Sequence, residues 1–364
     1  TPPFHGGNRG SNPLGDAISL SQPSGWLFRF YTLIPPALID IPHTNQYHLD
    51  NIAVLTKRLF MQNYPIGTPG KPWGEEEKEE WKQRQTIKRS YNDEVLKQLQ
   101  SIPEGFELKQ YGALPYDESR YPLYAVIPRD IPKNIEAAKP AVLVTGGVHG
   151  YETSGVQGAL QFINTKLSEY AEDFTIIVVP CVSPWGYETI NRWDQYALDP
   201  NRSFYPNSPA PESAQLMAFV ESLNLPFTLH IDLHETTDTD NSEFRPALAA
   251  RDATTHDNWN IPDGFYLVAN TTNPQKPFQE AIIDAVKQVT HIAPADDSGK
   301  IIGADLLSEG VICYDKKALY LCGGMTDAEF VTTTEVYPDS ANATADNCNV
   351  AQVAVITAAL EYIK

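Results

Sequence analysis

The chain has 364 residues, of which 42% are hydrophobic and 20% charged, a composition that excludes a wholly disordered protein. Lys and Arg number 27 against 46 Asp and Glu, so the net charge is −19. Nucleic acid is therefore an unsuitable partner, because its phosphates are bound by Lys and Arg. No run of about 18 apolar residues exists, so we expect no membrane span.

Two features of the sequence favour export. The chain begins with Thr1 rather than Met, which is consistent with a removed signal, a removed tag or a trimmed chain. Three short motifs match the glycosylation acceptor pattern, which is also common by chance: Asn201-Arg-Ser, Asn270-Thr-Thr and Asn342-Ala-Thr. We expect a secreted or periplasmic protein, with a cytoplasmic location as the alternative.

The first 89 residues are expected to form a partly helical N-terminal extension. Residues 1–25 are rich in Gly, Ser, Asn and Pro, which is typical of an arm or loop. Apolar positions at helical spacing predict a helix over 45–62. The charged run from Glu75 to Arg84 predicts a solvated helix, stabilised by pairs such as Glu80–Arg84.

From residue 90 to 364 strands and helices alternate, which predicts an α/β domain with a largely parallel sheet. Short apolar runs such as 141–145 are typical of buried central strands. The expected strands are 106–111, 123–127, 141–145, 174–179, 227–233, 265–269 and 331–336. The expected helices are 92–100, 155–167, 278–289 and 350–363.

Polar side chains follow the predicted strands at their carboxyl ends, where open α/β sheets carry their reactive residues. His149 and Glu152 come after 141–145, His234 ends 227–233, and Glu335 lies near the end of 331–336. Zinc binds imidazole nitrogen and carboxylate oxygen, and a catalytic site needs three such ligands. Spacing alone allows a capped helix start with a surface histidine, but the position of His149 after Gly146-Gly147 favours a metal site.

A distant histidine must supply the third ligand. His234 is the natural candidate, since Asp232 lies on the same strand face and can orient an imidazole. His230 shares that face, and we expect it to be a hydrogen-bonded core histidine. A two-metal site that uses His230 and Asp232 is a further alternative.

Taken together, these residues resemble the zinc metallocarboxypeptidase family over about residues 90–364. The matching features occur in the family's order: His149-x-x-Glu152, Asn201-Arg202, His234, the strand-borne Glu335, and Cys322-Gly-Gly-Met-Thr-Asp327. The resemblance implies a three-layer α/β/α fold around a twisted, mixed sheet. It also implies one zinc ion bound by His149, Glu152 and His234.

The resemblance assigns roles to five further residues. Glu335 would be the general base and then the general acid. Arg192 would stabilise the oxyanion, and Asn201 with Arg202 would bind the terminal carboxylate of the substrate. A tyrosine usually caps such sites. Tyr320 fits the order of the family's motif, and Tyr314 fits the distance to Glu335 better; we assign Tyr320.

Some motifs depart from the digestive carboxypeptidases, which carry an arginine where Tyr151 stands. His149-Gly-Tyr-Glu152, Asp232-Leu-His234 and Thr334-Glu335-Val look closer to the related succinylglutamate desuccinylases and aspartoacylases. Those acylases usually carry a β-domain after the catalytic glutamate, whereas the residues after Glu335 predict one closing helix. We expect a metallocarboxypeptidase for peptides with a free carboxylate. The alternatives are an N-acyl-amino-acid amidohydrolase and an inactive binding module.

Overall fold

A computed structural model describes residues 64–131, 139–256 and 260–364. The chain divides after Phe60, and the larger unit begins at Met61. The helix predicted over 45–62 and the arm over 1–25 lie outside the described residues. The boundary at residue 89 between the extension and the catalytic domain stays a prediction; residues 64–89 belong to the larger unit.

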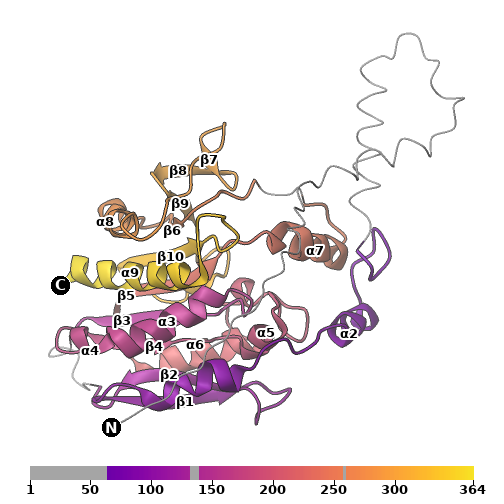
Figure 1. Cartoon of the computed structure of the whole chain (residues 1–364). Helices are drawn as coiled ribbons and strands as arrows, with labels where there is room; N and C mark the ends of the chain where they lie inside the picture. Colours follow the sequence, from indigo (N-terminus) through magenta and orange to yellow (C-terminus); the bar gives the residue numbers. More distant parts are fainter. Residues whose placement is uncertain (1–63, 132–138, 257–259) are drawn as a thin grey trace, which may run out of the picture. The chain divides into compact units, whose positions relative to one another are not determined.

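The described chain alternates strands and helices (Figure 1). Its α-helices are α2 (Glu75–Gln83), α3 (Thr153–Thr165), α4 (Leu167–Tyr170), α5 (Pro184–Thr189), α6 (Pro211–Leu223), α7 (Arg245–Asp252), α8 (Lys276–Val286) and α9 (Ala345–Ile363). Its strands are β1 (Phe106–Ala113), β2 (Pro122–Pro128), β3 (Ala141–Gly146), β4 (Thr175–Val179), β5 (Phe227–Glu235), β6 (Tyr266–Asn270), β7 (Lys300–Ile301), β8 (Ala304–Ser308), β9 (Val311–Tyr314) and β10 (Phe330–Val336).

The strands form one mixed sheet in the order β1-β2-β4-β3-β5-β10-β6-β9-β8-β7. The central strands β4, β3, β5 and β10 run parallel to one another, and the flanking pairs β2–β4 and β10–β6 are antiparallel. This confirms the predicted α/β fold with a mixed sheet. β3 and β4 are buried along their whole length because helices or loops cover both faces, which explains their unbroken apolar runs.

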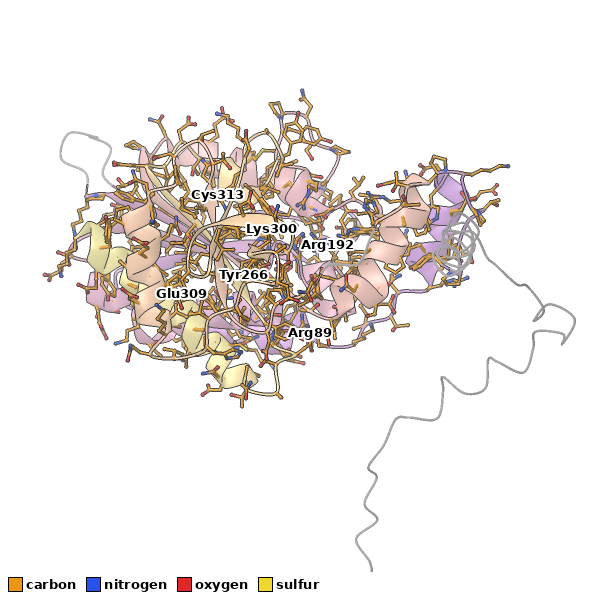
Figure 2. All side chains as sticks on the ribbon, turned by 90° about the horizontal axis from the view of Figure 1, so that it is seen from above. Arg89, Arg192, Tyr266, Lys300, Glu309 and Cys313 are labelled. Carbon is orange, nitrogen blue, oxygen red and sulfur yellow. The ribbon has the colours of Figure 1, made fainter. Side chains whose placement is uncertain are left out.

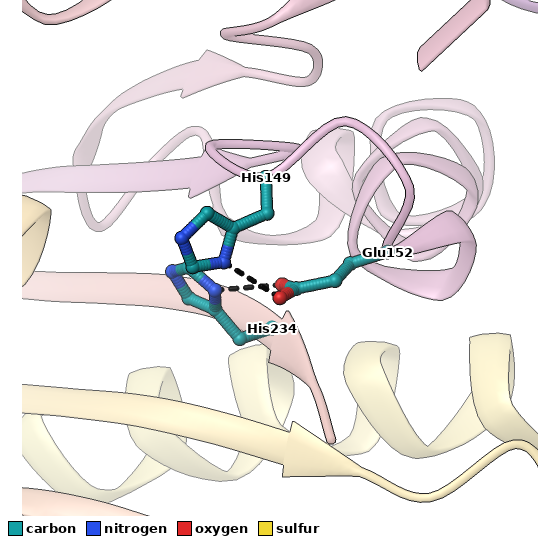
Figure 3. A group of neighbouring side chains, drawn as sticks. All are labelled: His149, Glu152 and His234. Carbon is teal, nitrogen blue, oxygen red and sulfur yellow. Dashed lines mark hydrogen bonds and ion pairs between the residues drawn. The ribbon is translucent and has the colours of Figure 1, made fainter. Parts of the chain in front are cut away.

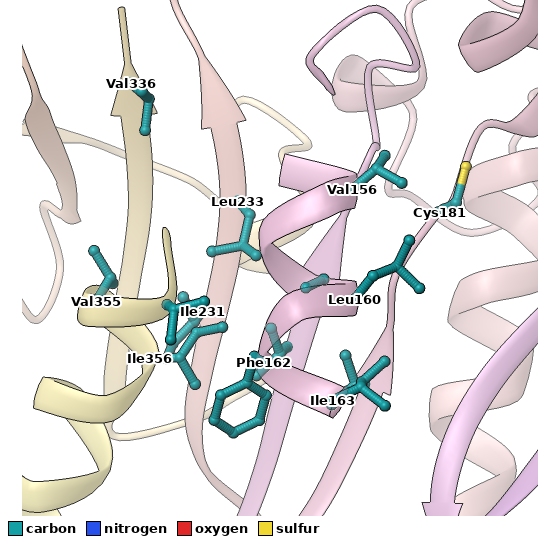
Figure 4. Close-up of a cluster of buried hydrophobic side chains, with 14 of the residues drawn as sticks. Val156, Leu160, Phe162, Ile163, Cys181, Ile231, Leu233, Val336, Val355 and Ile356 are labelled. Atoms are coloured by element: carbon teal, nitrogen blue, oxygen red, sulfur yellow. The ribbon is translucent and has the colours of Figure 1, made fainter. Parts of the chain in front are cut away.

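Helices cover both faces of the sheet and make three layers. On one face, α3 packs on β5, where Ile231 and Leu233 point toward it (Figure 4), α9 packs on α3 and β10, and α8 packs on α9 and β6. On the other face, α6 packs over a second core that includes Leu143 and Ile177. Side chains alternate along a strand, so His230, Asp232 and His234 of β5 point away from the α3 face. The candidate ligand His234 therefore lies on the side of α6.

The structure also departs from the predicted elements in places. Residues 92–100 form a short π-helical turn, Asn92–Leu96, and a 3₁₀ turn, Gln98–Ser101, instead of one α-helix. The strands β7, β8 and β9 were not predicted, because β7 has two residues and β8 is partly exposed without a clear alternation. α9 begins earlier than expected, at Ala345, where the Thr344 side chain accepts a hydrogen bond from the Asn347 amide.

Residues 64–89 pack on the rest of the larger unit through aromatic side chains. Trp81 of α2 contacts Trp185 and Trp193, with ring centroids 6.0 and 5.5 Å apart. The amide of Trp73 donates to the carbonyl of Arg251 at 2.8 Å. On the exposed side of α2, Arg84 pairs with Glu80, which confirms the predicted solvated helix.

Two further features concern the cysteines and the helices of the described chain. No disulfide joins the four cysteines, and Cys181, Cys322 and Cys348 are buried. Within the described ranges, no helix combines the length and the apolar character needed to cross a bilayer.

Candidate metal centre and substrate cavity

The turn between β3 and α3 carries two of the three candidate ligands. Gly147 adopts a φ of +62°, which is unfavourable for other residues and turns the chain out of β3. Gly150 packs so closely that a Cβ atom there would lie 2.0 Å from the Tyr187 amide nitrogen. The Glu152 amide donates to the His149 carbonyl at 3.2 Å, so both side chains leave one tight turn in the same direction. We call residues 149–152 the ligand turn.

The structure brings His149, Glu152 and His234 together, as predicted (Figure 3). One donor atom from each lies within 4.8 Å of the others, and all three side chains are buried. His149 Nδ1 lies 2.7 Å from Glu152 Oε1, and His234 Nδ1 lies 2.6 Å from Glu152 Oε2. Residues 149 and 234 meet because β3 and β5 are adjacent parallel strands whose carboxyl ends share one edge of the sheet.

A second carboxylate holds the far side of each imidazole. His149 Nε2 lies 3.0 Å from Asp199 Oδ1, and His234 Nε2 lies 2.9 Å from Asp232 Oδ2. A carboxylate accepts hydrogen bonds, so Nε2–H of each ring donates outward to Asp199 or Asp232, and Nδ1 is the ring atom that faces Glu152. Histidine ligands of metals are oriented in this way by outer carboxylates. The orienting role predicted for Asp232 agrees with this contact, whereas Asp199 was not predicted.

The electrostatics of the three side chains also suit a metal cation. Burial alone would lower the pKa of His234, but Glu152 and Asp232 together hold it well above its usual value. Burial would raise the pKa of Glu152, but His234 and His149 lower it to about 2. A positive charge is thus favoured between these carboxylates. Two imidazoles and one carboxylate are a donor set that zinc binds, so these residues fit a metal ion.

Glu335 lies beside the ligands, on the neighbouring strand. It pairs in register with His234 of β5, and its Oε2 accepts a hydrogen bond from Thr236 Oγ1 at 2.8 Å. Burial, reinforced by the negative charge of Glu152, raises the pKa of Glu335 to about 8 despite the opposing effect of His234. Glu335 is thus a carboxyl group that can hold and release a proton near neutral pH.

Arg192 lies close to the metal centre, and its guanidinium is bound by two carboxylates. Its Nε donates to Asp199 Oδ2 at 3.1 Å, and its Nη1 lies 3.3 Å from Asp240 Oδ1. The Tyr151 hydroxyl donates to the same Asp240 oxygen at 2.9 Å. Tyr151 therefore helps to hold Asp240, which in turn holds Arg192. No motif in the sequence pointed to Asp240.

Asn201 and Arg202 differ in how far they are available to a substrate. The Asn201 side chain is buried; its Oδ1 accepts from the Cys322 amide at 2.7 Å, and its Nδ2 lies 3.3 Å from His234 Nε2. Arg202 is exposed, and its Nη1 donates to the Asn201 carbonyl at 2.6 Å. Arg202 is therefore the more accessible of the two.

The two candidate tyrosines occupy different surroundings. Tyr320 is 49% exposed, and its ring packs on Tyr205 with centroids 5.0 Å apart. Tyr314 is half-buried; burial and the nearby Glu335 charge raise its pKa to about 12, while Arg202 opposes them. Tyr314 thus shares the surroundings of Glu335 and Arg202, whereas Tyr320 packs on Tyr205 and its carbonyl accepts from the Phe204 amide.

His230 is buried and hydrogen-bonded, as expected. Its Nε2 lies 3.2 Å from Thr145 Oγ1, and its Nδ1 lies 3.2 Å from Thr326 Oγ1. Burial lowers its pKa to about 4, so the ring is neutral near pH 7. Among the described residues, the one group of three His, Cys, Asp or Glu side chains that could hold a metal is His149, Glu152 and His234.

A cavity of about 650 Å³ lies next to Asp199, the residue that links it to the candidate metal centre; His149, Glu152, His234 and Glu335 do not line it. Arg192 and Asp199 form part of its wall, and Asp199 contacts His149. Figure 2 labels Arg192 on the ribbon. The other lining residues are mainly aromatic, aliphatic or charged: Pro72, Trp73, Lys78, Trp193, Ala197, Leu198, Arg202, Ser203, Tyr205, Asp240, Phe244, Arg245, Leu248, Arg251, Asp252 and His256.

Comparisons with known proteins agree with both resemblances seen in the sequence. Residues 138–263 match the succinylglutamate desuccinylase/aspartoacylase catalytic domain. This match contains the ligand turn and His234 but not Glu335. No curated protein matches the sequence.

Crystal structures of three bacterial proteins have similar folds. A predicted metallopeptidase of Shewanella denitrificans OS217 superposes with a TM-score of 0.56 at 15% identity, covering 75% of this chain and 88% of that chain. One from Shewanella amazonensis SB2B gives 0.55 at 17% identity, with 77% and 98% covered. A metallo-carboxypeptidase of Burkholderia cenocepacia gives 0.50 at 14% identity, with 80% and 69% covered.

The fold is therefore carboxypeptidase-like, and the sequence of residues 138–263 is similar to the desuccinylase/aspartoacylase catalytic domain. On this fold, the buried side chains of His149, Glu152 and His234 lie together at the carboxyl ends of β3 and β5.

Proposed function

We propose that this protein is a zinc-dependent hydrolase of the metallocarboxypeptidase type, which cleaves the amide bond next to a terminal carboxylate. The observation that carries the proposal is the convergence of His149, Glu152 and His234 beside Glu335 and the cavity. We propose one zinc ion per chain. When bound, zinc in such a site lowers the pKa of water to about 7 and polarises a carbonyl group.

Glu335 would transfer protons in this reaction. As a carboxylate it accepts a proton from the attacking water, and as a carboxylic acid it returns that proton to the leaving amine. Its raised pKa supports the second step, because a carboxyl group of ordinary pKa would hold little proton near pH 7. Thr236 supports the first step, since its hydroxyl fixes Glu335 Oε2 by a hydrogen bond.

Arg192 and Arg202 would bind the negative charges of the substrate and of the reaction. Arg192 Nη2 makes no hydrogen bond to any described residue, so it can donate to an oxyanion while Nε and Nη1 stay on Asp199 and Asp240. Arg202 lines the cavity and presents a guanidinium that suits bidentate binding of a carboxylate. Asn201 would position Arg202, whose Nη1 bonds its carbonyl.

For the residue that caps the substrate, Tyr314 is better placed than Tyr320, because it lies with Glu335 and Arg202. Tyr320 stays a prediction from the resemblance. Whichever tyrosine caps the site, the proposed substrate is a peptide, or an acyl-amino acid, with a free carboxylate. An N-acyl-amino-acid amidohydrolase is the second candidate, which the match of residues 138–263 favours.

A substrate panel separates these proposals. We expect hydrolysis of peptides with a free C-terminus, and a fall of more than tenfold in kcat/KM, about 2 kcal/mol, when that carboxylate is amidated. Turnover of acyl-amino acids alone would select the second candidate. Equal turnover of free and amidated substrates would reject both.

Metal content tests the zinc site separately from the substrate. After dialysis, His234→Ala should lose most of its zinc, whereas the control His230→Ala should keep it, because His230 bonds two threonines instead of Glu152. Zinc retention in His234→Ala together with its loss in His230→Ala would overturn the assignment.

A further inference from the structure

Arg89 contacts the ligand turn from a part of the chain outside both the proposed catalytic domain and the family match. Its Nη2 donates to the Gly150 carbonyl at 2.7 Å, and its Nη1 donates to Thr153 Oγ1 at 2.7 Å. Its Nε donates to the Tyr187 carbonyl at 2.6 Å, and its guanidinium carbon lies 3.5 Å from the centre of the Tyr187 ring. One side chain thus joins the ligand turn, the start of α3 and α5.

These bonds hold a turn whose position decides the metal site. Gly150 lies between the two ligands His149 and Glu152, and Thr153 directly follows the second. A shift of this backbone would move both donors relative to His234, which is fixed independently on β5. Gly150 has no side chain, and its carbonyl, which accepts the bond from Arg89, is one of the groups by which the turn is held from outside.

The segment that carries Arg89 is itself bound to the same region. The amides of Lys88 and Arg89 both donate to the Glu188 carbonyl, at 2.8 and 3.3 Å. Gln85 Oε1 accepts from Asn191 Nδ2 at 2.9 Å, and the Asn191 carbonyl accepts from the Tyr151 amide at 3.2 Å. The backbone that carries Arg89, a residue labelled in Figure 2, is therefore itself bound beside the ligand turn.

The far side of the turn is held by a carboxylate. Glu235 follows His234 at the end of β5, and its two oxygens accept from the amides of Thr153 and Ser154 at 3.1 and 2.7 Å. A cation near the first turn of a helix is ordinarily unfavourable, and Glu235 offsets the Arg89 charge at the start of α3. The turn is thus fixed between an arginine on one side and a glutamate on the other.

We propose that Arg89 is a positioning residue for the metal centre, because its guanidinium holds the ligand turn so that His149 and Glu152 converge with His234. This inference rests on the proposed zinc site. It also makes residues 85–91 a functional part of the catalytic unit. Arg89 contacts neither ligand side chain in the structure and acts through the backbone.

The variants are Arg89→Ala, Arg89→Lys and the control Arg120→Ala. Lysine keeps the charge but lacks the planar fork that reaches three acceptors, so it should restore only part of the effect. Arg120 is a matched control, because its Nε donates to the buried Glu188 at 2.6 Å in the same region but makes no contact with the ligand turn.

Two measurements are made on each full-length variant: hydrogen exchange of the amides at 149–153 without metal, and zinc affinity by competition with a chelator. In Arg89→Ala we expect faster exchange in the ligand turn and zinc binding about 10- to 100-fold weaker, as for other outer residues of metal sites. Arg89→Lys should lie between this variant and the wild type. Arg120→Ala should match the wild type in both measurements.

Wild-type exchange and affinity in a folded Arg89→Ala would overturn the proposal, as would an equal loss of affinity in Arg120→Ala. If Arg89→Ala does not fold, Arg89→Lys decides, and wild-type behaviour of that variant would overturn it. Failure of the wild type to bind zinc would reject the proposed function. The exchange measurement would then still show whether Arg89 holds the turn.

Discussion

At the scale of single residues, each histidine of the candidate metal centre lies between two carboxylates. Glu152 faces the Nδ1 atoms of both rings, while Asp199 and Asp232 bond the outer Nε2 atoms. The outer carboxylates fix the orientation of each ring. Both Nδ1 atoms are therefore directed toward Glu152, where a cation could bind. In the metal-free protein a proton on His234 carries that charge, so metal binding should release it.

Glu335 gives the sharpest test at this scale. Glu335→Gln keeps the size of the side chain and an oxygen for Thr236, but it cannot take a proton from water. We expect kcat to fall by about 10²- to 10⁴-fold. Zinc content and the thermal unfolding midpoint, measured on the same preparation, should stay close to wild type. Activity within a few-fold of wild type would assign Glu335 a structural role.

At the scale of elements, the site depends on hydrogen bonds from α9 to β5, β10 and α3. Gln352 of α9 is fully buried; its Nε2 donates to the His234 carbonyl at 3.0 Å and lies 3.2 Å from Ser154 Oγ in α3. Its Oε1 accepts from Thr334 Oγ1 of β10 at 2.7 Å. A single amide thus links β5, β10 and α3 directly behind His234 and Glu335.

Gln352→Leu should therefore destabilise the fold more than its size suggests. Leucine fills a similar volume, but it leaves the His234 carbonyl and the Thr334 hydroxyl without this partner in the core. Each unpaired buried group costs about 1–3 kcal/mol, so we expect a loss of about 2–4 kcal/mol in the free energy of unfolding. Urea denaturation measures this. The exposed Gln83→Leu in α2 is the control, and equal small effects would contradict the argument.

At the scale of the whole molecule, the net charge of −19 makes buried carboxyl groups important for stability. Asp194 and Glu212 are both fully buried, and Asp194 Oδ2 and Glu212 Oε2 have no hydrogen-bond partner among the described residues. Burial raises the pKa of Asp194 to about 7, and burial together with the Asp194 charge raises that of Glu212 well above its usual value. At least one of the two carboxyls therefore holds a proton in the folded protein near neutral pH.

This pair predicts a loss of stability as the pH rises. The folded pKa values lie above the unfolded values of about 4, so the contribution is complete below about pH 4 and is lost as the pH rises through about 7. Asp194→Asn removes the titrating group, so its free energy of unfolding should fall less between pH 5 and 8 than that of the wild type. Urea denaturation at several pH values tests this. The exposed control Asp297→Asn should follow the wild type, and parallel curves for all three proteins would contradict the prediction.

The sequence by itself determined the α/β class and the central strands, and it indicated the three candidate ligands His149, Glu152 and His234, which the structure brings together. It could do so because strand burial leaves unbroken apolar runs, and because reactive side chains follow strand ends at short, regular distances. The sequence also predicted His230 as a core histidine, because a site of three ligands needs only one from β5, and His234 is the candidate for it.

Only the tertiary structure decided which other groups meet these ligands. Asp199 and Arg89 contact the ligand turn, and Asp240 contacts Arg192. Each lies about 40 to 90 residues from the group it contacts, in a segment without a periodic pattern. Tyr314 and Tyr320 likewise differ by their surroundings rather than by a local motif. Local periodicity reports the burial of an element, whereas contacts between loops depend on the order of strands in the sheet. That order places β3 beside β5 and β5 beside β10. No single segment of the sequence determines it.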